Sequence, residues 1–294
     1  MKYRLKNDFL DVRFQALGGA LTSIRDYEGT EYLWQGDPAY WSGQAPVLFP
    51  ICGSIRDDHA VTRNGKQLHM PRHGIVRKKE FVCTEQTDEK IVFMIENDRS
   101  MFEQYPYAFR LEIEYTLLKQ TIRTKYRVIN LGDETMPFLI GGHPGFCCPI
   151  YRDEHYDDYY IEFAQNETCD VPLPISETGL IDVSHRKSFL KDQDRLMLTH
   201  TLFEKDAVIL DQLKSRRIRL LSKNHRKGIQ LEFADFPYLI LWSSANQGPF
   251  IALEPWIGLS TCSDEGDLFE EKRNMQNVKC GDIKEYTFDI SVLG

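Results

Sequence analysis

The stretch FLIGGHPGFCCPI (138–150) contains the residue in this chain that is best suited to chemistry. His143 stands between two glycines and a proline, directly after an apolar run that is typical of a buried strand. Glycine and proline are unfavourable inside strands, so their presence here indicates a backbone with a special local requirement. The sequence therefore predicts an imidazole held rigidly at the end of a sheet.

Three further segments share this pattern of an ionisable side chain at a strand end beside glycine or proline. They place Arg56 in 48–58, His73 and Arg77 in 69–81, and Glu254 in 250–260. A single strand-end histidine or glutamate is often only a turn residue or a structural hydrogen-bonding group. Strand ends on one side of a sheet can converge in space, however, so four such segments favour a common site.

These side chains suit acid–base chemistry better than metal binding. The sequence contains no H-x-H or H-E-x-x-H spacing, no G-x-S-x-G nucleophile and no phosphate-binding glycine loop. A histidine and a glutamate without metal or nucleophile can act as general acid and base on a neutral substrate. Opening a cyclic sugar uses such a pair: a base takes the proton of the anomeric hydroxyl while an acid protonates the ring oxygen. The same groups, with their roles reversed, close the ring on its other face.

Two neighbouring features bear on this chemistry. Burial of Glu254 against an apolar wall would raise its pKa toward the range useful for reversible proton transfer. Trp256, two residues later, could offer a flat surface to a pyranose, or it could simply belong to the core.

The elements that position these residues are predicted to be strands. Apolar and polar residues alternate over 111–117, 122–128, 229–234 and 286–292, whereas 91–95, 238–242 and 250–253 are more continuously apolar. Turn residues separate these segments, and only 267–276 has a weak helical pattern. We therefore expect an all-β fold: one large antiparallel β-sandwich with few short helices, forming a single domain over residues 1–294.

Composition excludes several classes of partner. The 294 residues have a formal net charge of −8, which gives no general attraction to nucleic acid or to an anionic membrane. The N-terminal residues are charged too often for a secretory signal, and no apolar run approaches the ~20 residues of a membrane span. The seven cysteines show no C-x-x-C spacing, and the adjacent Cys147 and Cys148 are interpreted as packing residues. We expect a soluble, cytoplasmic protein.

Several longer motifs occur together and in a familiar order: LFPICG, MPRHGIVR, GGHPGF, SRRIRL and IALEPWIGL. With them the chain resembles the aldose 1-epimerase (galactose mutarotase-like) family, and most closely its LacX-like branch. HPGF or EPW alone would be weakly specific, but the whole set extends over nearly the entire chain. The resemblance implies a β-supersandwich and conversion between the α- and β-anomers of an aldohexose without a cofactor.

The resemblance also implies roles for individual residues: general acid for His143, general base for Glu254 and substrate binding for His73. Better-known mutarotases often have an arginine where this chain has Ser54, and Arg56 is the predicted replacement. The family uses an aspartate to hold sugar hydroxyls. Asp206 is the nearest match, and Asp211 is its rival.

Arg77 leaves the substrate class open. HGIVR resembles the HGFAR segment of family members that act on hexose 6-phosphates, and a guanidinium group pairs well with phosphate oxygens. Arg77 and the lysines that follow it could equally form a solvated loop face. The predicted substrate is a neutral aldohexose, with a sugar phosphate as the alternative.

Non-catalytic functions also remain open. Proteins of this fold can bind carbohydrate as sensors or accessory domains, although the presence of both an acid and a base candidate favours catalysis. A polysaccharide lyase is less favoured, because such enzymes carry this sandwich beside another large domain. The working unit is expected to be a monomer or a homodimer.

Overall fold

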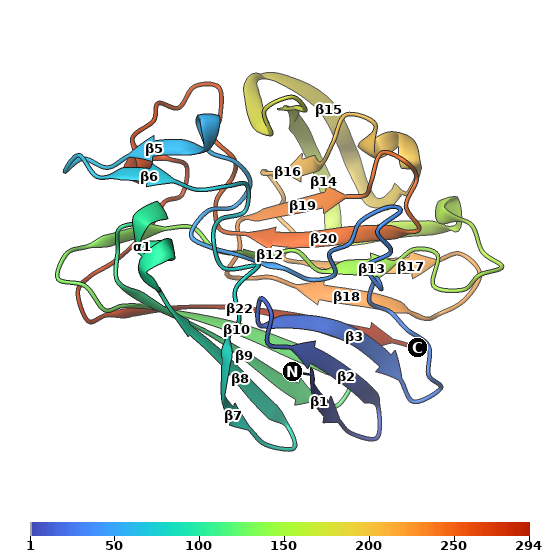
Figure 1. Cartoon of the computed structure of the whole chain (residues 1–294). Coiled ribbons are helices and arrows are strands. Elements are labelled where there is room, and N and C mark those ends of the chain that lie inside the picture. The colour runs from blue at the N-terminus through green and yellow to red at the C-terminus, as the bar shows by residue number, and fades with distance from the viewer. Residues whose placement is uncertain (1) are drawn as a thin grey trace.

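Antiparallel strands dominate the computed structural model, which describes residues 2–294 (Figure 1). Strand residues make up 51% of the structure and helical residues 7%. The helical share is far below the ~30–35% average of globular proteins, so the predicted all-β class is confirmed.

The largest sheet has nine strands within the described residues, in the order β15-β14-β17-β18-β22-β10-β9-β8-β7. In Figure 1 the strands β22, β10, β9, β8 and β7 fan out across the lower half of the molecule. The bounds are β7 (Val82–Gln86), β8 (Lys90–Glu96), β9 (Phe109–Leu118), β10 (Thr121–Asn130), β14 (Tyr159–Ile175), β15 (Leu180–Met197), β17 (Arg217–Ser222), β18 (Gly228–Glu232) and β22 (Ile283–Leu293).

A second sheet, of six strands among residues 2–294, lies across the middle of the molecule in Figure 1. Its order is β16-β19-β20-β12-β4, and β13 also pairs with β20. The bounds are β4 (Val47–Leu48), β12 (Gly141–Gly142), β13 (Gly145–Cys147), β16 (Val208–Leu210), β19 (Tyr238–Trp242) and β20 (Phe250–Trp256).

Smaller elements complete the described chain. The further strands are β1 (Lys2–Lys6), β2 (Leu10–Gln15), β3 (Ala20–Asp26), β5 (His59–Val61), β6 (Gln67–His69), β11 (Met136–Phe138) and β21 (Gln276–Val278). The helical elements are α1 (Arg99–Gln104) and the 3-10 turns η1 (Arg56–Asp58), η2 (Tyr156–Asp158), η3 (His200–Phe203) and η4 (Phe269–Glu271). None of the helical elements in residues 2–294 has the length and apolar character needed to cross a membrane.

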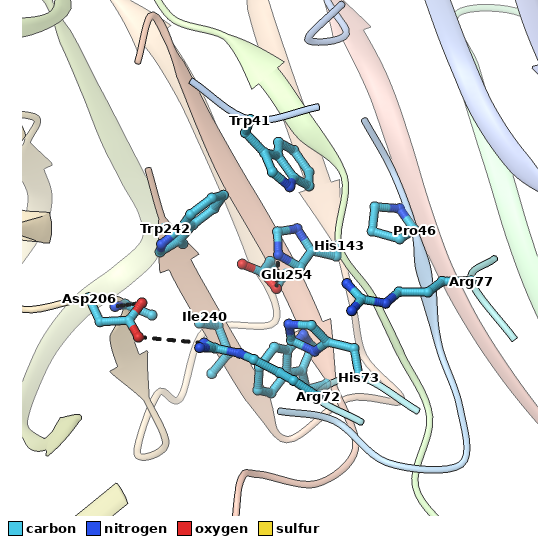
Figure 2. Close-up of a pocket in the computed structure, with 12 residues that line it drawn as sticks. Trp41, Pro46, Arg72, His73, Arg77, His143, Asp206, Ile240, Trp242 and Glu254 are labelled. Carbon is cyan, nitrogen blue, oxygen red and sulfur yellow. Dashed lines mark hydrogen bonds and ion pairs between the residues drawn. The ribbon is translucent and has the colours of Figure 1, made fainter. Parts of the chain in front are cut away.

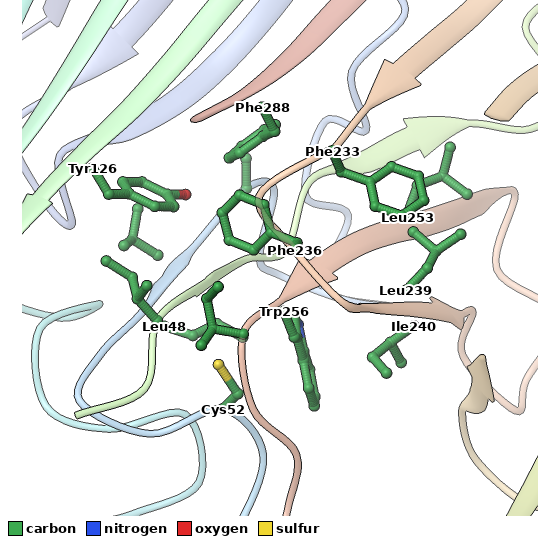
Figure 3. Packing of buried hydrophobic residues seen from close by; sticks show 14 of the residues in the cluster. Leu48, Cys52, Tyr126, Phe233, Phe236, Leu239, Ile240, Leu253, Trp256 and Phe288 are labelled. Carbon is green, nitrogen blue, oxygen red and sulfur yellow. The ribbon is translucent and has the colours of Figure 1, made fainter. Parts of the chain in front are cut away.

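The core lies between the two large sheets. Leu239 and Leu253 of the six-stranded sheet pack toward Phe233, Phe236 and Phe288 (Figure 3), and all five side chains are buried. Alternate residues of a strand point to opposite faces, so the neighbours of Leu239 and Leu253 face away from this core. One face of the six-stranded sheet therefore fills the core, and the other is available for a site.

All seven predicted strand segments are confirmed by β8, β9, β10, β18, β19, β20 and β22. The predicted alternation also holds in β10, where Ile122, Thr124, Tyr126 and Val128 are buried.

The weak helical pattern over 267–276 was misleading. Only the single turn of η4 forms there, because Lys272 leaves helical geometry and extends inward, where its Nζ donates to Thr261 Oγ1 at 2.6 Å.

Candidate active site

A pocket of about 190 Å³ opens on the face of the six-stranded sheet that does not carry the core (Figure 2). Six of the seven sequence-predicted site residues line it: His73, Arg77, His143, Asp206, Glu254 and Trp256. They come from segments far apart in the sequence, and the sheet brings them together.

Strands β19 and β20 form the floor of this pocket. Glu254 is paired with Ile240 of β19, and Trp242 is paired with Ala252. Because alternate residues share a face, Glu254 and Trp256 point to the same side, together with Ile240 and Trp242. Every residue of β20 is buried, and Glu254 is only 1% exposed. The sheet therefore holds a carboxyl group almost completely out of water.

His143 directly follows β12, and the glycines of that strand explain its position. Gly141 pairs with Trp256 on one side and with Leu48 on the other. A Cβ atom on Gly141 would lie 2.8 Å from Cδ1 of Trp256, so a larger residue would push β12 away from β20. The His143 N–H donates to the carbonyl of Pro46 at 3.1 Å. The glycine-rich sequence thus brings the imidazole next to the strand that carries Glu254.

His143 and Glu254 form a close, buried pair. Nε2 of His143 lies 3.3 Å from Oε2 of Glu254, and His143 is 7% exposed. Burial raises the pKa of Glu254 well above its usual range, an effect that the Arg72 charge opposes. Burial also lowers the pKa of His143, to about 3, and the charges of Arg72 and Arg77 act in the same direction. Together these shifts favour a pair that holds one proton over a wide pH range.

His73 is oriented by the backbone around it. Its Nδ1 accepts a hydrogen bond from the Gly53 N–H at 3.2 Å, so the neutral ring carries its proton on Nε2. Burial, followed by the charge of His143, lowers the pKa of His73 well below its usual value. His73 is therefore a neutral donor. The next residue has to be glycine, because Gly74 has φ +77° and a Cβ there would lie 2.1 Å from the Phe49 carbonyl oxygen.

Charged side chains line another part of the pocket. Arg72 Nη2 lies 3.5 Å from Oδ2 of Asp206, and Arg72 is the more exposed partner. Arg77 also lines the pocket, but its guanidinium has no hydrogen bond or ion pair with any residue in 2–294. Burial and the nearby Arg72 charge lower the pKa of Arg77. This part of the pocket offers both donors and acceptors to a ligand.

Two aromatic residues of the pocket were not predicted from the sequence. Trp41, from the loop between Gln35 and Pro46, stacks on His143 with ring centroids 4.8 Å apart, and Trp242 meets His143 edge-on at 5.6 Å. Arg72 was missed as well. An aromatic residue in a loop rich in glycine and proline was the only signal for Trp41, and it is a weak one.

Two other candidates lie outside the pocket: Arg56, which was predicted to belong to the site, and Asp211, the rival of Asp206. Arg56 Nη2 donates to the Glu265 carbonyl at 2.9 Å, and its Nη1 lies 3.7 Å from Oδ1 of Asp267. Arg56 therefore holds a neighbouring loop and does not line the pocket. Asp211 accepts two hydrogen bonds from Arg186, at 2.7 and 3.0 Å. Of the two candidate aspartates, only Asp206 lines the pocket.

Trp256 occupies the wall beside His73. Its ring meets the His73 imidazole edge-on, with centroids 5.6 Å apart, and the residue is 4% exposed. It thus both lines the pocket and belongs to the core.

Metal-binding and thiol chemistry have little support in the described residues. No group of three or more His, Cys, Asp or Glu side chains in 2–294 could hold a metal ion. Burial raises the pKa of Cys147 to about 12 and also raises that of Cys148 well above its usual value, so both thiols stay protonated. The two cysteines next to the His143 segment are consistent with packing residues.

The sequence and the fold are those of a known family. A family model described as aldose 1-epimerase matches residues 1–267, and the chain belongs to that family. It is 47% identical over 298 residues to the plasmid-encoded protein LacX of Lactococcus lactis subsp. lactis, with both chains fully covered, and the chromosomal LacX matches equally well. The resemblance predicted from the motifs is therefore confirmed.

Solved structures agree with this assignment. A galactose mutarotase related enzyme from Lactobacillus acidophilus superposes with a TM-score of 0.93 at 27% identity, covering 99% of this chain and 97% of the other. A galactose mutarotase-like protein from Lactobacillus casei ATCC 334 gives a TM-score of 0.88 at 27% identity, with 99% and 100% coverage.

Proposed function

We propose that this protein is an aldose 1-epimerase that interconverts the α- and β-anomers of an aldohexose without a cofactor. The main support is the 3.3 Å approach of His143 Nε2 to Glu254 Oε2 in a buried pocket. The anomeric hydroxyl oxygen and the ring oxygen are both bonded to C1, so the acid and the base that serve them have to lie close together. Membership of the aldose 1-epimerase family supports the same reaction.

The reaction needs only one proton on the pair. Glu254 as carboxylate takes the proton of the C1 hydroxyl while protonated His143 gives its proton to the ring oxygen, and the C1–O5 bond breaks. After rotation about C1–C2, the C5 hydroxyl attacks the other face of the aldehyde. His143 takes the proton from that hydroxyl, and Glu254 returns its own to the aldehyde oxygen. The pair ends as it began.

The electrostatic surroundings fit this exchange. Burial favours the uncharged form of each group, so the resting pair is a protonated Glu254 beside a neutral His143. The working form has the proton on His143 instead, and the nearby positive charge of Arg72 stabilises the Glu254 carboxylate. One proton transfer over a short distance separates the two forms.

The remaining polar side chains would hold the sugar. His73 presents its Nε2–H as a donor, Arg72 adds donors and Asp206 adds acceptors, which together match hydroxyl groups that both donate and accept. A neutral aldohexose such as glucose or galactose is the proposed substrate.

A hexose 6-phosphate is the second candidate, and one observation favours it. Arg77 faces the pocket without an ion-pair partner among residues 2–294, and Arg72 has only a 3.5 Å contact with Asp206. A phosphate could receive charge-assisted hydrogen bonds from both guanidinium groups.

Polarimetry on purified protein tests the proposal. Freshly dissolved α-glucose, α-galactose and α-glucose 6-phosphate should each be followed to equilibrium with and without protein near neutral pH. An epimerase accelerates the approach to equilibrium in proportion to its concentration. If sugars bind but the rate never exceeds the spontaneous one, the protein is a carbohydrate-binding or sensor protein instead. The single domain over 1–294, the cytoplasmic location and the choice between monomer and homodimer remain predictions.

A further inference from the structure

Trp41 packs directly on the proposed acid. Its ring lies 4.8 Å from that of His143 with an interplanar angle of 29°, which is a stacked arrangement (Figure 2). It also stacks on Phe250 at 5.4 Å and meets Trp242 edge-on at 5.4 Å. The indole is thus fixed by three rings, one of which is the catalytic imidazole.

His143 has few other restraints on its ring. Its Nδ1 is buried and has no hydrogen-bond partner in the described residues, so no acceptor fixes the imidazole from that side. Catalytic histidines are commonly oriented by a hydrogen bond to the second nitrogen. Here packing takes over that function: Trp41 stacks on the ring, whereas His73 and Trp242 meet it edge-on.

The loop that carries Trp41 is held in place. Nε1 of Trp34 donates to the Trp41 carbonyl at 2.7 Å, and Nδ2 of Asn246 donates to the Ala39 carbonyl at 2.7 Å. The indole also needs the glycine two residues after His143, because a Cβ on Gly145 would lie 2.7 Å from its Cζ3 atom. The HPGF sequence and the loop are therefore matched to each other.

We propose that Trp41 is a positioning residue that fixes the His143 imidazole against Glu254 and keeps water away from that pair. This inference rests on the proposed function, since it assigns Trp41 to the acid–base step. Trp41 acts through His143 and is not itself an acid or a base.

The ionisable groups near the pair come from elements other than the loop that carries Trp41. His73, Arg72 and Arg77 come from the segment after β6, Asp206 comes from the turn after η3, and Glu254 lies on β20. Removing the indole takes away the ring stacked on His143 and lets water reach the pair. Hydration stabilises the charged form of each group, so the pKa of His143 should rise and that of Glu254 should fall.

The test compares Trp41→Ala with Trp41→Phe, which keeps a stacking ring. Trp41→Ala should lower kcat by about a hundredfold, the scale expected for a displaced catalytic group, with little change in KM. In its pH profile of kcat/KM the acid limb should move to higher pH and the alkaline limb to lower pH. Trp41→Phe should keep most of the wild-type kcat, and both limbs of its pH profile should lie at the wild-type pH values. Tyr27→Ala removes an aromatic ring that is 78% exposed and does not line the pocket, so it is the control and should resemble the wild type.

A second readout does not depend on turnover. In isotopically labelled protein the His143 ring should stay neutral down to about pH 3 in the wild type and titrate closer to 6.5 in Trp41→Ala. If Trp41→Ala does not fold, Gly145→Ala displaces the indole without removing it and should shift the limbs in the same direction.

Two outcomes would overturn the inference. If Trp41→Ala lowers kcat but leaves both limbs of the pH profile in place, Trp41 only supports the fold. If it raises KM and changes nothing else, Trp41 is a sugar-binding surface. An inactive wild type would instead refute the proposed function, and the His143 titration would still decide the role of Trp41.

Discussion

Replacing Glu254 by Gln tests the proposed base most directly. The substitution keeps the shape of a side chain that is 1% exposed and removes only its ability to accept and return a proton. Loss of a general acid or base typically lowers the rate by on the order of 10²–10⁴, which corresponds to about 2.7–5.4 kcal/mol of transition-state stabilisation. Sugar affinity should change much less, because one ground-state hydrogen bond contributes about 0.5–1.5 kcal/mol.

Above pH 6.5 the same substitution should increase the free energy of unfolding relative to the wild type. Above the ordinary His pKa of 6.5 the unfolded chain carries no proton on either group, whereas the folded pair keeps one because burial raises the pKa of Glu254. The folded state then binds more protons than the unfolded state, so stability falls as pH rises. The slope is about 1.4 kcal/mol per pH unit until the raised pKa of Glu254 is reached. Glu254→Gln removes this slope.

The assay combines polarimetric mutarotation with urea unfolding at two pH values above 6.5. Glu232→Gln, an exposed carboxylate on β18, is the matched control and should leave the rate and the pH slope unchanged. His143→Asn should reduce the rate on the same scale as Glu254→Gln. The double variant should be little slower than either single one, because the pair acts as a unit. A Glu254→Gln protein that keeps wild-type turnover would refute the assignment of the base.

Three further predictions follow from the same geometry. The kcat/KM of the wild type should stay level through mildly acidic pH, because the pair gains a second proton, on His143, only near pH 3. It should fall at alkaline pH, once Glu254 loses its proton. A bell-shaped profile centred on the ordinary His pKa would contradict this prediction. Arg77→Gln should raise KM for glucose 6-phosphate at least about tenfold, because a charge-assisted hydrogen bond is lost, and should leave KM for glucose unchanged. An equal effect on both sugars would exclude an anion-specific role. Gly74→Ala should lower the free energy of unfolding by more than about 1 kcal/mol, since φ is +77° and the Cβ would clash with a main-chain carbonyl; an unchanged urea midpoint would contradict this.

The strands and the two principal residues of the candidate site could be predicted because their signals are local. The sequence shows directly the alternation of apolar and polar residues that becomes β10 and the apolar run that becomes the buried strand β20. His143 and Glu254 stand beside glycine or proline, where an ionisable residue is conspicuous. The two residues converge because β12 pairs with β20, a pairing that Gly141 permits.

The missed residues depend on long-range packing, which leaves little trace in a local pattern. Trp41 lies about a hundred positions before His143, and its loop shows no regular periodicity. Arg56 and Arg72 are both arginines in loops rich in glycine or proline, and only the folded chain decides which one faces the pocket. Arg56 is turned to the 265–267 segment, whereas Arg72 meets Asp206.

The pocket and the core cannot vary independently in this fold. Gly141 approaches Trp256, Trp256 packs edge-on against His73, and His73 meets His143 edge-on at 5.5 Å. Since Nδ1 of His143 has no hydrogen-bond partner in the described chain, this chain of ring contacts and the stack on Trp41 determine where the imidazole points. The precise placement of the proposed acid therefore comes from close packing, which transmits displacement from the sheet to the site. A substitution that loosens the contact between β12 and β20 should for this reason reduce catalysis more than its effect on stability alone would suggest.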